Sequence, residues 1–80
     1  EEEVRCREFV IDRTNWFIEA PTRPQPCAVK IRYQIDETRC RVEPVDRGFR
    51  GVLEDPRIVT PGQSAGFYDR DLVLGGGIIL

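Results

Sequence analysis

Apolar and polar residues alternate most regularly in two runs, 27–35 and 38–42. In both runs the apolar side chains fall on one face and the charged ones on the other, as with Val29 and Ile31 against Lys30. Successive side chains of a β-strand point to opposite faces, so each run predicts a strand with one buried face. The acidic pair 36–37 between the runs predicts a two-residue hairpin link, although it lacks the Gly that such links favour. The residues expected to be buried are Val29, Ile31, Tyr33, Ile35, Thr38, Cys40 and Val42.

Shorter runs with strand character lie on both sides of this hairpin. They are separated by turn-forming residues and cover 8–17, 49–54, 57–60, 64–68, 72–74 and 78–80. No stretch of helix length repeats its apolar residues every 3.6 positions. Six or seven short strands at this spacing predict an all-β barrel or sandwich. A small closed antiparallel barrel is the preferred fold, because closure removes exposed strand edges.

Eighty residues are enough for one domain with a small core. Residues 1–7 are interpreted as a linker or the end of a preceding segment, and 8–80 as the β-barrel domain. No apolar run approaches the ~20 residues that span a bilayer, so no membrane partner is expected. The acidic start is the opposite of the basic end of a signal peptide.

The formal net charge is −2, which gives nucleic acid no long-range attraction. The cations are unusual in type, because eleven of the twelve are Arg and only Lys30 is Lys. Arginine binds phosphate with two parallel hydrogen bonds and stacks on bases. The alternative is an Arg-rich composition without a binding role.

The three cysteines are far apart in sequence, and there is no histidine. This composition predicts neither a disulfide framework nor a metal site, and reduced thiols fit a cytoplasmic location. Cys27 and Cys40 are expected to be small core residues, and Cys6 is the thiol expected to be exposed. Without a histidine or a marked nucleophile, we expect no catalytic residues in this chain.

A two-residue link at 36–37 places Arg32 directly opposite Arg41, and Lys30 opposite Glu43. Like charges opposite each other destabilise a sheet, whereas a phosphate bound between the two guanidiniums would reverse that effect. The hairpin, including Arg39, is therefore a candidate for RNA binding. The alternative is a solvated face neutralised by nearby carboxylates.

Trp16 could stack on an exposed base, but a single Trp in a small barrel is more often part of the core. Arg13 and Asn15, near the same strand end, are then the better candidates for RNA contact. The triplet Gly75–Gly77 is not followed by the Lys and Ser/Thr of a phosphate-binding loop. It predicts a bulge or a close crossing of backbones.

Several segments together resemble a known family. They are TPGQSAGFYD at 60–69, LGGGII at 74–79, TNWF at 14–17, IRY at 31–33 and DPR at 55–57. Their order and spacing resemble the C-terminal domain of the bacterial-type tRNA 2-thiouridylases, ATP-dependent enzymes that thiolate the wobble uridine of certain tRNAs. The resemblance covers residues 8–80. One departure is Gly51, which replaces a larger inward-facing residue.

The resemblance implies a Greek-key-like barrel similar to domain II of elongation factors and to the aminomethyltransferase barrel. It also implies a tRNA-binding accessory domain that is no enzyme by itself. ATP and the catalytic cysteines of that family belong to an N-terminal ATP-pyrophosphatase domain with an S-G-G-x-D-S loop, which is absent here. The expected partners are tRNA, that N-terminal domain and a sulfur-carrier protein. The alternative is a structural or protein-interaction barrel. The candidate RNA-binding residues are Arg13, Asn15, Lys30, Arg32, Arg39 and Arg41.

Overall fold

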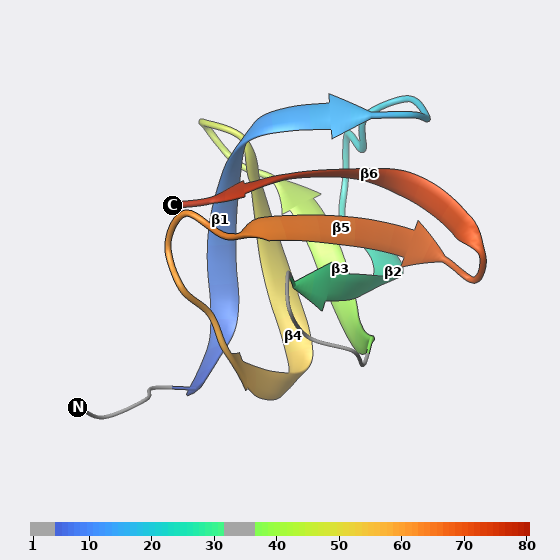
Figure 1. The fold of residues 1–80 in the computed structure, drawn as a ribbon. Helices are drawn as coiled ribbons and strands as arrows, with labels where there is room; N and C mark the ends of the chain where they lie inside the picture. Colours follow the sequence, from blue (N-terminus) through green and yellow to red (C-terminus); the bar gives the residue numbers. More distant parts are fainter. Residues whose placement is uncertain (1–4, 32–36) are drawn as a thin grey trace.

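The computed structural model describes residues 5–31 and 37–80, and these residues form six antiparallel strands. The strands are β1 (Arg5–Trp16), β2 (Gln25–Ile31), β3 (Thr38–Pro44), β4 (Phe49–Ile58), β5 (Ser64–Asp69) and β6 (Leu72–Ile79). They close into a barrel in the order β1-β4-β3-β2-β5-β6, with β6 next to β1 (Figure 1). The first four strands follow the Greek-key order. The predicted all-β closed barrel is therefore confirmed.

Three strands are longer than the sequence patterns indicate. The predicted pieces 72–74 and 78–80 are joined through Gly75–Gly77 in the single strand β6, and β4 continues to Ile58. Strand β1 begins at Arg5, within the segment interpreted as a linker, and pairs Arg5 with Ile58. None of the described segments forms a helix with the length and hydropathy of a membrane span.

The alternating patterns correctly identify the inward faces of the described strands. Thr38, Cys40 and Val42 are all buried on β3, as are Val29 and Ile31 on β2. The contacts between aromatic rings at the centre of the core could not be predicted from the alternation of apolar and polar residues. Phe67 is fully buried, Phe9 stacks at 6.5 Å from it and Trp16 at 5.9 Å, measured between ring centroids. The remaining buried apolar residues are Ile11, Leu53, Ala65, Leu74 and Ile79.

The predicted register of the β2–β3 hairpin is wrong. The structure pairs Val29 with Thr38, whereas a two-residue link would place Ile35 there. The true register differs by six residues, and because six is even, every inward-facing side chain still faces inward. The alternation therefore could not distinguish the two registers. Residues Arg32–Asp36 lie outside the described part of the chain.

The corrected register changes the neighbours of the basic residues. Arg41 lies opposite Pro26 on β2, and Lys30 pairs across the sheet with Gly66 of β5 rather than with Glu43. The β2 residue opposite Arg41 is therefore Pro26, and Lys30 does not lie opposite Glu43; Arg32 itself lies outside the described residues. The predicted phosphate position between Arg32 and Arg41 depended on that pairing and is withdrawn.

The glycine triplet lies where β6 passes closely between its two neighbours. A Cβ on Gly76 would clash with the carbonyl oxygen of Ala65 in β5, and one on Gly77 would lie 2.8 Å from the carbonyl oxygen of Asp12 in β1. The register also shifts along both ladders of β6, between Phe67 and Tyr68 on β5 and between Asp12 and Asn15 on β1. The predicted bulge and close backbone crossing are both confirmed.

We predict that Gly76→Ala lowers the stability of the chain by about 1–3 kcal/mol, because the added methyl group must displace backbone rather than a side chain. In thermal unfolding this corresponds to a fall of roughly 4–8 °C for each kcal/mol. Gly66→Ala, at the position opposite Gly76, is the matched control. Its methyl group would meet only the Tyr68 ring, at 3.3 Å. Equal melting temperatures for the two variants would contradict the account.

Candidate nucleic-acid interface

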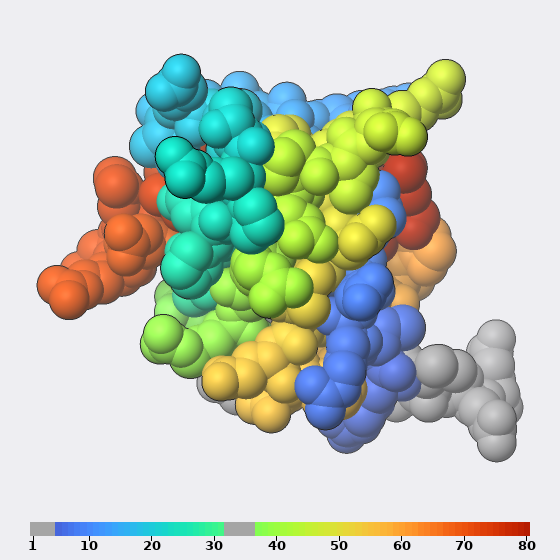
Figure 2. All heavy atoms as spheres, turned by 180° about the vertical axis from the view of Figure 1, so that it is seen from behind, coloured from blue at the N-terminus to red at the C-terminus, as the bar shows by residue number. Residues whose placement is uncertain are grey.

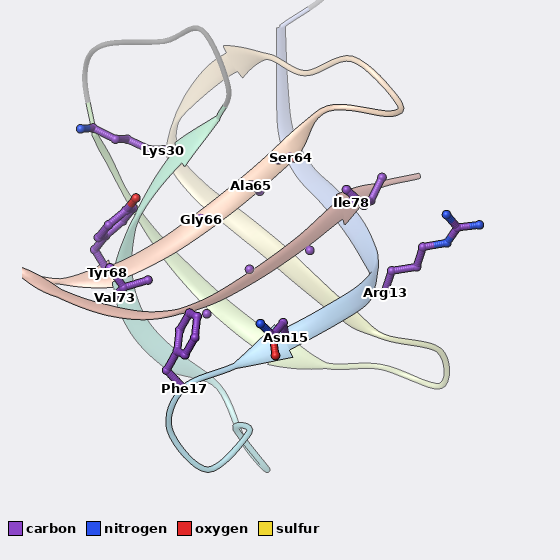
Figure 3. A pocket seen from close by; sticks show the side chains of 13 residues that line it. Arg13, Asn15, Phe17, Lys30, Ser64, Ala65, Gly66, Tyr68, Val73 and Ile78 are labelled. Atoms are coloured by element: carbon purple, nitrogen blue, oxygen red, sulfur yellow. The ribbon is translucent and has the colours of Figure 1, made fainter.

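An open groove of about 430 Å³ runs over the outer side of β5 and β6 toward the end of β1 (Figure 3). Its lining includes four glycines, Gly66 on β5 and Gly75–Gly77 on β6. Gly66 and Gly76 lie directly opposite each other and face outward, so at this point the groove is lined by backbone without side chains, whereas Gly75 and Gly77 pair with the buried Phe67 and Ala65. A ligand can therefore come close to the strand backbone there.

Three of the predicted RNA-binding residues line this single groove. Arg13 and Asn15 reach it from β1, and Lys30 reaches it from β2 (Figure 3). Arg13 sits at the register shift of β1 with φ 51°, and its N–H donates to the Asp12 carboxylate at 2.6 Å. Figure 3 shows Arg13 and Lys30 on opposite sides of the groove. The two cationic side chains therefore flank the groove on opposite sides (Figure 3).

Two aromatic side chains complete the lining. Tyr68 lies over Gly66, where a side chain at position 66 would otherwise stand. Phe17 is 69% exposed, and its backbone N–H donates to the Leu74 carbonyl at 2.9 Å, which fixes it beside β6. Figure 3 shows both rings on the side of the groove where Val73 lies. Tyr68 is half-buried. Accessible aromatic rings next to cations are typical of surfaces that stack nucleobases while holding phosphates.

The sequence analysis did not identify these two rings as groove residues, although the alternation of inward- and outward-facing strand positions could have indicated them. Phe17 follows Trp16, and Tyr68 follows Phe67. In each pair the first ring belongs to the core and the second is directed outward. Trp16 itself packs edge-on against Phe49 at 4.9 Å, and its buried Nε1 has no hydrogen-bond partner among the described residues. The core interpretation of Trp16 is confirmed.

Two of the other predicted RNA-binding residues, Arg39 and Arg41, do not line this groove. Arg39 and Arg41 are exposed on β3, and Figure 2 shows the side of the barrel where β2, β3, β4 and β1 follow one another. Arg41 Nε is 3.6 Å from the Glu43 carboxylate, which also lies 3.3 Å from Arg50 Nη1. A carboxylate thus partly neutralises Arg41, as the alternative interpretation of the hairpin required. Arg32 falls outside the described residues.

The described residues contain no group of three or more His, Cys, Asp or Glu side chains arranged to hold a metal ion. The polar groups that line the groove are a guanidinium, an ammonium, amides and hydroxyls. This set can bind an anion and hydrogen bond to bases, and it does not include an acid–base pair or an activated nucleophile.

Comparison with known proteins shows that the chain is similar to one part of larger proteins. A family profile described as the aminomethyltransferase β-barrel domain matches residues 6–79. The tRNA-specific 2-thiouridylase MnmA of Pasteurella multocida is 41% identical over 74 residues, which are 89% of this chain and 19% of that protein. The MnmA of Halothermothrix orenii is 40% identical over 82 residues, covering 99% of this chain and 23% of that protein.

A third relative, the MnmA of Chlamydia trachomatis serovar L2, is 37% identical over 75 residues, or 91% of this chain and 21% of that protein. The chain thus spans about a fifth of the length of the curated relatives it matches. The resemblance of its motifs to the C-terminal domain of the tRNA 2-thiouridylases is confirmed. With its closed six-stranded barrel and a profile match over nearly its whole length, the chain belongs to the aminomethyltransferase β-barrel domain family.

Proposed function

We propose that this barrel is the tRNA-binding accessory domain of a tRNA wobble-uridine 2-thiouridylase, holding the tRNA while a separate domain does the chemistry. The observation that carries the proposal is that Arg13, Asn15 and Lys30 line one groove together with two aromatic rings, the exposed Phe17 and the half-buried Tyr68. The relatives, named tRNA-specific 2-thiouridylases, supply the class of RNA.

The groove offers each kind of contact that RNA requires. Arg13 and Lys30 would bind backbone phosphates on its two sides, and the Asn15 amide would hydrogen bond to a base or ribose. Tyr68 and Phe17 would stack on bases. The glycine bottom would let the ribose–phosphate backbone approach the strands closely. Because the net charge is −2, the affinity would depend on these local contacts and would be modest for the barrel alone.

The chemistry belongs elsewhere in this proposal. ATP would bind to an N-terminal ATP-pyrophosphatase domain, and this barrel would hold no cofactor itself. The same domain would be the permanent partner of the barrel, and a sulfur-carrier protein would meet the catalytic domain rather than the groove. The setting would be the cytoplasm, where the three thiols stay reduced.

A protein-interaction role is the second candidate, and exposed apolar side chains favour it. Leu72 is 57% and Val73 40% exposed at the turn between β5 and β6, close to Phe17. This turn projects from the barrel (Figure 1). Apolar residues gathered on a projecting turn are suited to pack against another domain of the same enzyme. The two roles are compatible if RNA occupies the groove and protein covers the turn.

We predict that the double variant Arg13→Glu/Lys30→Glu binds tRNA several-fold more weakly than the unchanged chain. The slope of log affinity against log salt should also become shallower by about 2, one for each lost phosphate contact. The measurement is a tRNA titration of the chain over a series of salt concentrations, with folding checked by circular dichroism.

The matched control is Arg39→Glu/Arg41→Glu, which changes the net charge by the same amount on the outer face of β3. We expect it to reduce affinity less and to leave the salt slope closer to that of the unchanged chain. The reverse order of the two variants would assign RNA binding to β3. Equal, small effects would favour the protein-interaction role.

We also predict that Tyr68→Ala costs about 1–3 kcal/mol of tRNA-binding free energy, whereas Tyr68→Phe retains most of the affinity, because stacking requires the ring and not the hydroxyl. Leu72→Ala is the control, since it removes an exposed apolar side chain that does not line the groove. Competition titration at one salt concentration measures all three. A loss with Leu72→Ala as large as with Tyr68→Ala would argue against stacking in the groove.

A further inference from the structure

Two of the three cysteines face each other across neighbouring strands. Cys27 of β2 and Cys40 of β3 are direct partners in the ladder, and their Sγ atoms are 3.3 Å apart and hydrogen bonded, with either sulfur able to donate. Both are free thiols. Directly opposite residues of an antiparallel pair have their Cβ atoms about 4.5–5.5 Å apart, close to the separation that a disulfide spans. The corrected register of the hairpin creates this pair.

The two thiols are not equivalent. Cys40 is buried, and donation of its S–H to Cys27 together with burial raises its pKa. The pKa of Cys27 is lowered by the hydrogen bond from Cys40 and, to a smaller extent, by the Val42 backbone, while burial and the Asp69 carboxylate oppose this. The thiolate is the form that attacks a disulfide. Cys27 is therefore the better nucleophile of the pair, and Cys40 is suited to be the resolving thiol that reacts second.

Cys27 also has a route to solvent. It lines an open hollow between β2, β3 and β5, together with Arg39, Tyr68 and Arg70. The two guanidiniums can attract the carboxylates of an anionic thiol reagent, although Glu37 and Asp69 lie in the same lining. Cys40, on the inner face of β3, is buried and lies directly opposite Cys27.

We propose that Cys27 and Cys40 are a dithiol that exchanges with low-molecular-weight disulfides such as glutathione disulfide and closes reversibly into a cross-strand disulfide. This is a modification site separate from the RNA groove, and it does not depend on the proposed function. Two thiols that act only as small apolar residues are the competing interpretation.

The exchange has two balanced steps. Cys27 thiolate attacks one sulfur of the disulfide RSSR, a Cys27–SR bond forms, and one RS⁻ leaves. Cys40 then loses its proton to solvent and attacks Sγ of Cys27, which expels the second RS⁻. The dithiol is oxidised by two electrons, and RSSR is reduced to two thiols. For the second step the two sulfurs must approach by roughly 1.3 Å, to the length of an S–S bond.

The test is to equilibrate the folded chain with mixtures of glutathione and glutathione disulfide and to measure its intact mass. We expect a species that has lost two hydrogens and carries no glutathione, with Cys27 linked to Cys40 in the peptide map. Excess glutathione should restore the starting mass. The same titration in urea should require a more oxidising mixture, because unfolding separates the two thiols.

The three cysteines allow matched controls. Cys6→Ser should form the internal disulfide as readily as the unchanged chain, whereas Cys40→Ser should stop at a glutathione adduct on Cys27. Three outcomes would overturn the proposal. The chain could retain three thiols, it could carry glutathione adducts without an internal disulfide, or its disulfide could involve Cys6. The peptide map of the unchanged chain decides this even if a variant fails to fold.

Discussion

Closure of the barrel depends on strand β6, which has only glycines where it lies closest to the backbones of its two neighbours. Strand β6 joins β5 to β1, and its glycines bring backbone against backbone on both sides. A six-stranded sheet left open here would present two unpaired edges, which are sites for association with other chains. The same closure encloses Phe67, so that the aromatic centre of the core and the completion of the hydrogen-bonded ladder depend on each other.

The constraint that closes the cylinder also shapes its outer surface. Gly76, whose Cβ would meet the Ala65 carbonyl, and Gly66 opposite it leave the outer side of β5 and β6 without side chains at this point, so a shallow depression forms there. Three polar residues flank the depression: Arg13 from a bulge on β1, Lys30 from β2, and Tyr68 beside Gly66. Close strand packing and the groove that we propose for RNA therefore share one sequence feature.

The sequence predicts the faces of the strands well and their pairing less well, for a physical reason. Burial has a period of two, so the alternation identifies Val29 and Val42 as inward-facing in any register with the correct parity. The register of the hairpin depends instead on the length of its connection, which composition does not encode when no Asn-Gly or Gly-Gly marks a tight turn. Candidate residues chosen by their place near a strand end, such as Arg13, did reach the groove. Arg41 was chosen because a predicted hairpin register placed it opposite Arg32, and the true register places it opposite Pro26 instead.

Tyr68 belongs to the lining of both the groove and the hollow beside Cys27. One aromatic ring therefore borders both the groove that we propose for RNA and the hollow that Cys27 lines. A ligand that moved this ring would change the access of solvent to Cys27. The rate at which a reagent reaches Cys27 would accordingly serve as a built-in reporter of occupancy in the neighbouring depression.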